Sequence, residues 1–511
     1  MTAAPLVTFN LILVAVFTFL AYLVYHFKKR YDHWRKLDVP FLGIKEDIVF
    51  DWDKNRTYAF QDRYNKLDPL PYGGIFQATK PILLLRDPEL IKAVMIKDFA
   101  HFTDRGIVFD EKLDPLMPHL FNLGGQRWKS VRAKLTPTFS SGKLKSMFTL
   151  MEGCIQILDQ YLTESLDGNG QSKEIDVLRL MSELTTDVIG TCAFGWDCGA
   201  IGNEGSEFRR ISKKFSINRF KFFLRMACRS INPKIFTWLR WKGFDPEVEA
   251  FYLNITKEAV EKREENKEKR KDFLQLLINV QHEEQKMLQS LNDGSEPLFK
   301  DHVVAAQVFI FFLAGFDTTA NTLTYCLYEL ALHPDITAKL HAEITRVLKA
   351  YDGKVTYESL KEMHYMDTIV SETLRKYPPL GFLDRVCTKA YELPNSSLLI
   401  KPDTSVMIPV YALHYDPKYY PDPEKFDPDR FSEENKGNLV PGTYFPFGDG
   451  PRICIGMRFA QMEIKSALSL IVRKYTVHTT DKTPIPATFK TNSFINRSAQ
   501  PITLTFKRRD S

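Results

Sequence analysis

The feature that most constrains this chain is a glycine-rich loop that carries one cysteine near the C-terminal end. Residues 447–456 read Phe-Gly-Asp-Gly-Pro-Arg-Ile-Cys-Ile-Gly, and the cysteine is Cys454. Residues 455–475 contain no proline and a single glycine, Gly456, which predicts a helix. The loop therefore presents a thiol at a helix N-terminus, where backbone N–H groups and the helix dipole stabilise a thiolate. The glycines allow the backbone to approach a flat, bulky group without Cβ clashes.

Two interpretations of Cys454 compete. A cysteine taken at random is most often a buried core thiol. A thiolate that receives backbone N–H bonds and faces a flat group is instead suited to ligate haem iron. The spacing Phe-x-x-Gly-x-Arg-x-Cys-x-Gly favours the second interpretation, because all of its fixed residues are present. It resembles the haem-thiolate signature of cytochrome P450 enzymes.

The resemblance extends from about residue 35 to the end of the chain. It implies the cytochrome P450 fold, which is mainly α with small β-sheets. It also implies haem b as cofactor, with Cys454 as the axial ligand of the iron and Phe447 beside the haem. The 511 residues, 44% hydrophobic and 26% charged, suit a large globular body.

The cysteines and the charge exclude several other classes. Seven cysteines are scattered without a Cys-x-x-Cys or Cys-x-x-Cys-His motif, which argues against a disulfide framework, a zinc site and covalently attached haem. The net charge of +6 is too small to indicate nucleic-acid binding on its own. Residues 205–245 combine aromatic with basic side chains but match no nucleic-acid motif. We expect this segment to lie against lipid.

The N-terminal segment predicts a membrane anchor. Residues 6–27 contain no acidic residue, lysine or arginine, and about 20 such residues cross a bilayer. Lys28, Lys29 and Arg30 follow, and the positive-inside rule places them in the cytosol. We therefore expect residues 1–30 to be an uncleaved signal-anchor with a single pass through the endoplasmic reticulum membrane. Residues 31–511 then form one cytosolic catalytic domain, since no linker divides them.

A long apolar helix is predicted over residues 301–332. It carries Ala314, Gly315 and the pair Asp317–Thr318, although a mid-helix glycine alone costs about 1 kcal/mol. The small residues allow a flat cofactor to approach, and Thr318 can donate back to the Ala314 carbonyl. An ordinary threonine bend in a core helix is the alternative. The motif resembles the oxygen-activation pair of the family, which implies catalytic roles for Asp317 and Thr318.

Other positions owe their interpretation to the resemblance. Glu372 and Arg375 lie one helical turn apart, an arrangement common on helices. In this family the pair is joined by an arginine from a later loop, here Arg430, and the three residues brace the cysteine loop. Further positions are expected to hold the haem propionates, although Trp128 and Arg132 alone could simply pair a cation with an aromatic ring. These positions are Trp128, Arg132, Arg385 and Arg452.

The electron source is expected to be another protein. The chain lacks a Gly-x-Gly-x-x-Gly motif between a strand and a helix, which argues against a nucleotide site of its own. The resemblance implies NADPH–cytochrome P450 reductase as donor, with cytochrome b5 as a second candidate, and dioxygen as co-substrate. The residues expected to form a basic docking face are Lys129, Arg132, Lys134, Arg458 and Lys465.

The chain looks most like insect microsomal members that oxidise xenobiotics, which implies a lipophilic substrate. The expected pocket residues are Phe109, Phe121, Phe309, Phe312, Ala314, Phe382 and Phe494. An aromatic pocket suits such molecules, whether xenobiotics or endogenous lipids and hormones. Two alternatives to a monooxygenase stay open. One is a reductase-independent isomerase or dehydratase of oxygenated lipids, and the other is a non-enzymatic haem sensor or carrier.

Overall fold

The structure is a computed structural model that describes most of the body of the chain. The described residues are 13–14, 17–18, 21–22, 24–25, 28, 31–43, 54–77, 80–167, 172–214, 242–266, 270, 272–291, 296–491 and 493–509. Most of the predicted anchor, residues 1–30, lies outside them. Its described residues are helical, and their large apolar side chains, such as Val14, Phe17 and Val24, are exposed. Most of the predicted lipid-facing segment, residues 215–241, also lies outside them.

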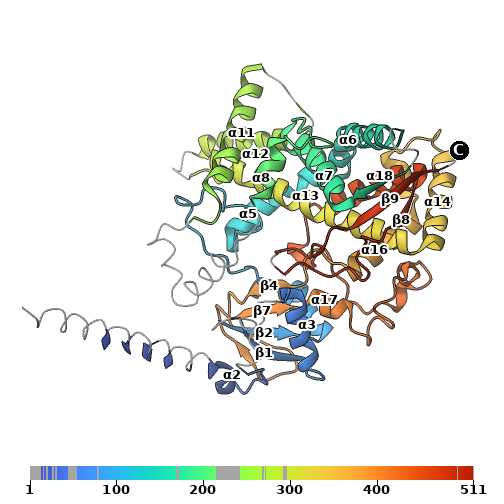
Figure 1. The fold of residues 1–511 in the computed structure, drawn as a ribbon. Helices are drawn as coiled ribbons and strands as arrows, with labels where there is room; N and C mark the ends of the chain where they lie inside the picture. Colours follow the sequence, from blue (N-terminus) through green and yellow to red (C-terminus); the bar gives the residue numbers. More distant parts are fainter. Residues whose placement is uncertain are drawn as a thin grey trace, which may run out of the picture.

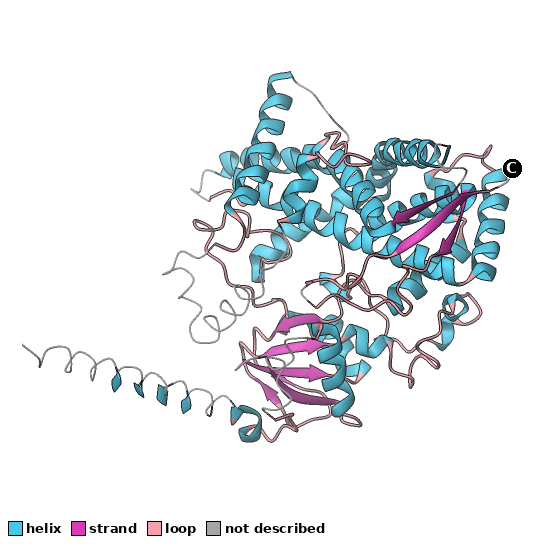
Figure 2. Ribbon diagram, viewed as in Figure 1, coloured by secondary structure: helices cyan, strands magenta, loops and turns pink. Residues whose placement is uncertain are grey.

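Helices make up most of the body, as predicted (Figures 1 and 2). A proline-preceding aspartate, Asp87, caps one of them by accepting the N–H groups of Glu89 and Leu90. The α-helices are α2 (His33–Lys36), α3 (Arg56–Lys66), α4 (Pro88–Lys92), α5 (Gly125–Leu135), α6 (Ser141–Asp167), α7 (Val177–Phe194), α8 (Glu207–Lys213), α11 (Pro246–Asn266), α12 (Phe273–Leu291), α13 (Asp301–Leu332), α14 (Pro334–Lys349), α15 (Tyr357–Lys361), α16 (His364–Lys376), α17 (Val410–His414) and α18 (Met457–Lys474). Short turns of other helix types are η3 (Ala93–Lys97), η4 (Phe99–His101), η5 (Thr136–Phe139), η6 (Pro428–Phe431), η7 (Lys436–Asn438) and η8 (Gly450–Arg452).

The strands form small sheets at two places around the helical body (Figure 2). They are β1 (Tyr72–Gln77), β2 (Lys80–Leu85), β3 (Ser172–Asp176), β4 (Leu383–Val386), β5 (Tyr391–Glu392), β6 (Leu399–Ile400), β7 (Ser405–Ile408), β8 (Tyr475–Thr479) and β9 (Thr503–Arg508). The first sheet has the order β1-β2-β7-β4, the second β3-β9-β8, and β5 pairs with β6. β1 and β2 form an antiparallel pair.

Helix α13 runs through the centre of the body and organises the larger core (Figure 1). Among the described residues it is the one helix long and apolar enough to cross a membrane. However, 67% of its most apolar window is buried inside the protein. It packs against α7, α11, α16 and α18. A helix that is apolar on all sides and buried in this way is a core helix.

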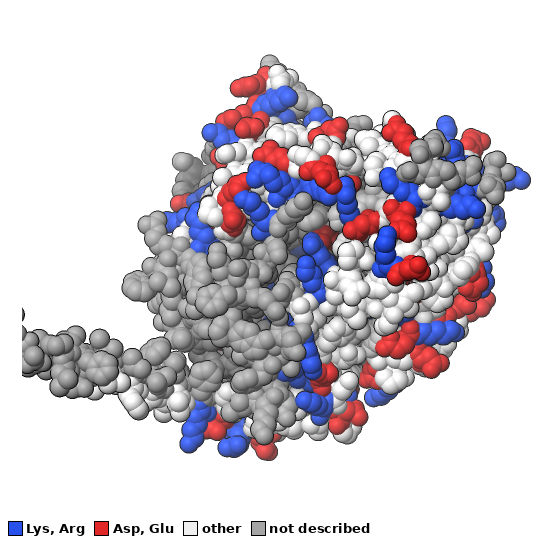
Figure 3. All heavy atoms as spheres, in the orientation of Figure 1, with Lys and Arg blue, Asp and Glu red and all other residues white. Residues whose placement is uncertain are grey.

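A second, smaller core lies around the four-stranded sheet, beside α3 and α17. β7 is buried at every position, as expected for an inner strand that is covered on both faces. On the face seen in Figure 3, positive and negative side chains alternate over the described surface. Neither sign gathers into one field there, in keeping with the small net charge of +6.

Candidate functional site

The cysteine loop has the tight backbone that its glycines predicted. Gly448 and Gly450 have φ angles of +76° and +65°, which side chains with a Cβ rarely adopt. A Cβ on Gly450 would lie 1.9 Å from the carbonyl oxygen of Met95, so the loop presses against η3. The N–H of Cys454 donates to the Phe447 carbonyl at 2.9 Å, and α18 begins at Met457. The cysteine therefore sits at a helix N-terminus, within a closed turn.

The thiol of Cys454 lies deep in the protein and is nevertheless accessible. This combination places it against an internal space. Burial raises the pKa of the thiol, while the N–H groups of Gly456 and Met457 and the charges of Arg132 and Arg105 oppose that rise. Hence the local groups favour a thiolate, and the cost that they offset is desolvation.

Four guanidinium groups lie near this thiol or near one another: Arg105, Arg132, Arg385 and Arg452. Within the described part of the chain, none forms an ion pair with a carboxylate. Arg452 is the best held, because it donates to the carbonyls of Thr103 and Leu123 at 2.5 and 2.6 Å. Its guanidinium also lies 4.3 Å from the centre of the Trp128 ring.

The arginines are close enough to repel one another. Burial and the nearby Arg385 lower the pKa of Arg452 to about 9, and burial lowers the pKa of Arg385 to about 10. Burial, Arg385 and Arg452 lower the pKa of Arg105 strongly. Nη1 of Arg452 and Nε of Arg385 are buried and have no hydrogen-bond partner. A cluster of buried cations with spare donors is suited to hold a ligand that carries more than one negative charge.

The predicted pair on α13 lies in the middle of the helix, with the two side chains in different surroundings. Thr318 donates to the Ala314 carbonyl at 2.7 Å, as predicted. Ala314 is exposed and Thr318 is partly exposed, although most of the helix is buried, so this side of α13 also faces an open space. Asp317 forms two contacts to Arg497 instead, one of them from Nε to Oδ1 at 2.8 Å.

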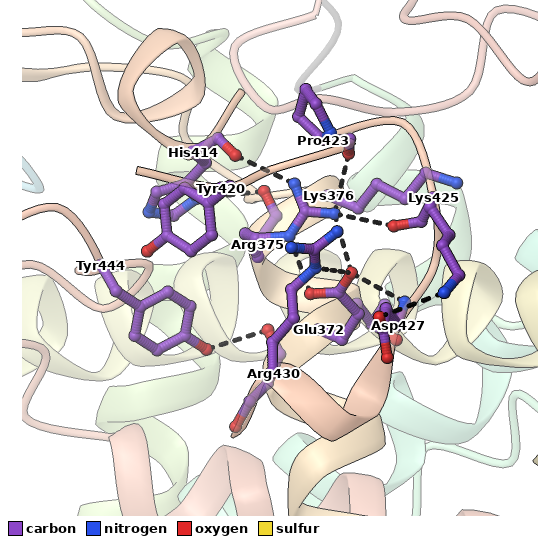
Figure 4. A network of polar contacts seen from close by, with 12 residues as sticks. Glu372, Arg375, Lys376, His414, Tyr420, Pro423, Lys425, Asp427, Arg430 and Tyr444 are labelled. Atoms are coloured by element: carbon purple, nitrogen blue, oxygen red, sulfur yellow. Dashed lines mark hydrogen bonds and ion pairs between the residues drawn. The ribbon is translucent and has the colours of Figure 1, made fainter. Parts of the chain in front are cut away.

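Glu372, Arg375 and Arg430 meet in one buried network (Figure 4). Arg375 donates Nε and Nη2 to the two oxygens of Glu372 at 2.7 and 2.8 Å, and both side chains are fully buried. Arg430 lies 3.5 Å from the same carboxylate, and the N–H of Asp427 donates to it at 2.9 Å. Burial alone would lower the pKa of Arg375, but the Glu372 carboxylate outweighs it and raises that pKa.

Arg375 also binds the chain that leads to the cysteine loop. Nη1 donates to the His414 carbonyl at 2.9 Å, and Nη2 donates to the carbonyls of Pro423 and Lys425 at 2.9 and 3.2 Å (Figure 4). One side chain of α16 thereby connects α17 with the loop that follows it. Glu372 and Arg375, at the centre of the network, have no exposed surface, so neither side chain can touch a substrate.

The expected pocket residues are not gathered on one accessible wall. Phe309 and Phe312 have no exposed surface and pack in an aromatic core with Tyr252, which differs from the expectation that they line the pocket. The sequence of a helix that is apolar on all sides does not show which side faces an open space. In α13 the exposed side carries Ala314. The remaining four are spread out: Phe109 is partly buried, Phe121 lies under Arg105, Phe382 packs on Phe60, and Phe494 is 57% exposed.

The chain is similar to known proteins over most of its length. The model of the family described as cytochrome P450 matches residues 40–506. Cytochrome P450 6k1 from Blattella germanica is 38% identical over 97% of this chain and 96% of its own. Cytochrome P450 6a2 from Drosophila melanogaster is 38% identical over 95% of this chain and 96% of its own. The chain belongs to the cytochrome P450 family. It is therefore a haem-thiolate monooxygenase that uses dioxygen, and the predictions of family, fold class and enzyme class are confirmed.

The site of this cytochrome P450 fits a haem group. A haem carries two propionates, and Arg385 and Arg452 have spare buried donors, with Asp384 and Asp104 acting on these two arginines only beyond ion-pair distance. The accessible thiol of Cys454 is the soft anionic ligand that haem iron accepts. No group of three or more potential metal-ligating side chains occurs among the described residues.

Sequence reasoning missed two residues of this cytochrome P450 and misplaced another. Arg105 and Arg497 lie in loops and match no motif, so neither had a local signal. Lys465 was expected on a docking face, but it is buried and donates to Asp367 at 2.7 Å. Of the other expected docking residues, Lys129 and Arg458 are exposed.

Proposed function

We propose that this enzyme inserts one oxygen atom from dioxygen into lipophilic small molecules at the cytosolic face of the endoplasmic reticulum membrane. Its electrons come from NADPH through a membrane-bound reductase. The observation that carries the proposal is the accessible Cys454 thiol at a helix N-terminus, surrounded by arginines with spare donors. The insect relatives over nearly the whole chain support a substrate class of lipophilic xenobiotics or endogenous lipids.

We assign the haem contacts as follows. Cys454 would supply the thiolate that ligates the haem iron, and Phe447, whose carbonyl accepts the Cys454 N–H, supports the cysteine turn. Arg105, Arg132, Arg385 and Arg452 would hold the propionates. Trp128 keeps the guanidinium of Arg452 in place through the contact of its ring. Such outer contacts set the orientation of the group and the electron donation of the sulfur.

The protons of the reaction pass through α13. A haem held by the Cys454 thiolate would supply dioxygen chemistry that needs two electrons and two protons for each oxygen atom inserted. Thr318 is placed to hold and pass a proton, because its hydroxyl faces the open side of the helix. Asp317, the neighbouring acid, takes protons from solvent and supplies Thr318. Phe109, Phe121, Phe382 and Phe494 line the substrate path, with Ala314 next to the reacting centre.

The remaining assignments concern support and electron supply. Glu372, Arg375 and Arg430 hold the segment before the cysteine loop and take no part in the chemistry. Residues 1–30 anchor the enzyme, with residues 31–511 in the cytosol. Lys129 and Arg458 attract an acidic reductase or cytochrome b5, since exposed cations steer such partners.

The test uses the full chain in membranes. We expect the reduced, carbon-monoxide-treated protein to show the absorbance band typical of thiolate ligation. Cys454→Ala should abolish that band. The control Cys198→Ala removes a thiol from the loop after α7, distant in sequence from Cys454, and should retain the band. A Cys454→Ala protein that keeps the band would refute the ligand assignment.

The proton path has its own matched variants. Thr318→Ala is expected to separate NADPH consumption from product formation with a lipophilic substrate. Thr324→Ala removes a back-bond of the same length, 2.7 Å to Ala320, on a buried side of α13, and should leave the coupling intact. Equal coupling in the two variants would contradict the role of Thr318. Substrates are found by screening lipophilic compounds for spectral shifts of the bound haem.

A further inference from the structure

The partner of Asp317 comes from a loop near the C-terminus. Arg497 approaches the carboxylate with two nitrogens, Nε and Nη2, and so forms a bidentate ion pair with it. The Asp317 side chain is 15% exposed and that of Arg497 is 35% exposed. Asp317 is thus shielded from water, whereas the arginine reaches solvent. The two residues are separated by 180 positions in the chain.

The loop that carries Arg497 is held tightly by the preceding residue, Asn496, which is 2% exposed. Its Oδ1 accepts the Thr57 hydroxyl of α3 at 2.7 Å, and its Nδ2 donates to the Pro378 carbonyl at 2.8 Å. Its own carbonyl accepts Nδ2 of Asn321 at 2.9 Å. Asn321 and Asp317 are one turn apart on the same face of α13. Two consecutive loop residues therefore dock on two consecutive turns of that helix.

Arg497 is the charged group that acts on the Asp317 carboxylate within the described part of the chain. Helix α7 packs beside it, and Thr185 donates to the Phe316 carbonyl at 2.8 Å. The acids of α7 are engaged elsewhere: Asp187 accepts N–H groups from Ala200 and Ile201, and Glu183 pairs with arginines. Burial raises the pKa of Asp317, and Arg497 opposes that rise.

We propose that Arg497 is a positioning residue for oxygen activation: its bidentate contact holds Asp317 ionised and oriented, so that this acid can take up and release protons at neutral pH. The inference rests on the proposed role of Asp317 as a proton donor to Thr318. A relay acid transfers protons well only when it exchanges them near the working pH. Without the arginine, the desolvated carboxyl keeps its proton and the relay stops.

The exposed position of Arg497 gives the proton a route. In each cycle a solvent proton binds Asp317, which loosens its charge pair with the arginine. The proton then passes to the oxygen of Thr318, while the hydroxyl proton leaves its hydrogen bond with the Ala314 carbonyl and moves toward the reacting centre. The carboxylate returns to its anionic form and re-forms both contacts to Arg497. Solvent therefore supplies the proton, and the reductase supplies the two electrons.

The protonation state of Asp317 can be measured independently of turnover. Infrared difference spectra of the holoenzyme are recorded against pH for the wild type, Arg497→Gln, Arg497→Lys and Asp317→Asn. We expect a protonated carboxyl band that Asp317→Asn removes. In Arg497→Gln this band persists to higher pH than in the wild type, and in Arg497→Lys the shift is smaller, because a point charge replaces the bidentate fork. A band that titrates identically in the wild type and Arg497→Gln overturns the inference.

Turnover separates the inference from the proposed function. Asp317→Asn should lower product formed per NADPH at every pH. Arg497→Gln should lower it about 10-fold at neutral pH, with recovery as the pH rises, and should have no further effect in the Asp317→Asn background. If Asp317→Asn leaves coupling unchanged, the relay itself is wrong. If only Asp317→Asn has an effect, the relay stands and the role of Arg497 is wrong.

The controls address folding and general charge effects. Lys482→Gln removes a cation from an exposed pair with Glu174 in the same C-terminal region, and it should match the wild type in both assays. Holoenzyme content is read from the carbon-monoxide spectrum. If Arg497→Gln does not assemble, Arg497→Lys decides, because it keeps the charge and loses only the fork. An Arg497→Lys enzyme with wild-type pH dependence would then refute the positioning role.

Discussion

Replacing Arg375 by glutamine tests whether the buried network acts as an ion pair or as a brace for the chain before the cysteine loop. Arg375 donates five hydrogen bonds, two to Glu372 and three to main-chain carbonyls of residues 414, 423 and 425. Glutamine keeps a good helix-forming side chain but loses the charge and most of the donors. The variant therefore removes both kinds of contact, while Glu372→Gln removes only the first.

The magnitudes follow from burial. Both side chains are fully buried, so solvent screening does not weaken the pair. Breaking such a pair from one side costs roughly 3–5 kcal/mol, and hydrogen bonds from charged donors contribute roughly 1.5–3 kcal/mol each. Arg430 still balances Glu372 after the change. We expect Arg375→Gln to lower the free energy of unfolding by about 4–6 kcal/mol, a large part of the roughly 5–15 kcal/mol of a typical protein. Glu372→Gln should cost about 3–4 kcal/mol, the lower part of the range for breaking a buried pair from one side, since Arg375 keeps its carbonyls.

The double variant decides between the two roles. If the three carbonyl contacts dominate, Glu372→Gln/Arg375→Gln should lie within about 1 kcal/mol of Arg375→Gln. Urea midpoints and slopes of the holoenzyme give the free energies, and the carbon-monoxide spectrum reports intact thiolate ligation. Arg473→Gln, at an exposed arginine that donates to the Gly353 carbonyl, is the control and should have a small effect. Recovery of several kcal/mol in the double variant would show that an uncompensated charge was the main cost, and the brace argument would be refuted.

Three further changes test other parts of the fold. Gly450→Ala should prevent haem-thiolate formation, because its Cβ would meet the Met95 carbonyl at 1.9 Å, whereas Gly437→Ala has open space and should give the normal carbon-monoxide spectrum. Burial raises the pKa of Asp187 from 3.8 to about 6, so the folded protein holds a proton between these pH values that the unfolded chain has released. Stability should thus fall by about 3 kcal/mol as the pH rises through this window, and urea midpoints of Asp187→Asn should lack that dependence. Asn55→Ala removes the N-cap of α3 and a hydrogen bond to the Lys490 carbonyl. The same urea assay should show a free energy of unfolding lower by about 2 kcal/mol, more than the loss of a solvent-exposed cap alone would cause.

Local sequence patterns predicted the elements whose cause is local. Helix α13 begins and ends at the predicted residues, 301 and 332, because its apolar run is bounded by polar sequence and by Pro334. The bond from Thr318 to Ala314 follows from helix geometry alone. Strand β3, in contrast, forms at residues 172–176 because it pairs with β9, more than 300 positions away. No local window contains that partner.

The contacts between distant segments are what the sequence did not reveal. Arg105 and Arg497 are ordinary surface-type residues by composition, and only the fold places one beside Cys454 and the other on Asp317. Lys465 illustrates the reverse case, because a basic residue on an amphipathic helix is normally exposed, but here Asp367 binds it in the interior. The family resemblance supplied the roles of motif residues, and it was silent on residues outside the motifs.

The loop of residues 489–498 links three functions that the motifs treat as separate. Asn496 ties it to α3 and to the turn after α16, Arg497 binds the acid of α13, and Phe494 lies three residues earlier at an exposed position. A substrate that contacts Phe494 thereby touches a segment whose hydrogen bonds also hold Asp317. Substitutions at this loop should consequently change substrate preference and the coupling of NADPH use to product together. If the loop only shaped the pocket, its substitutions would change substrate preference, and the coupling of NADPH use to product would then vary only with how well each substrate fits.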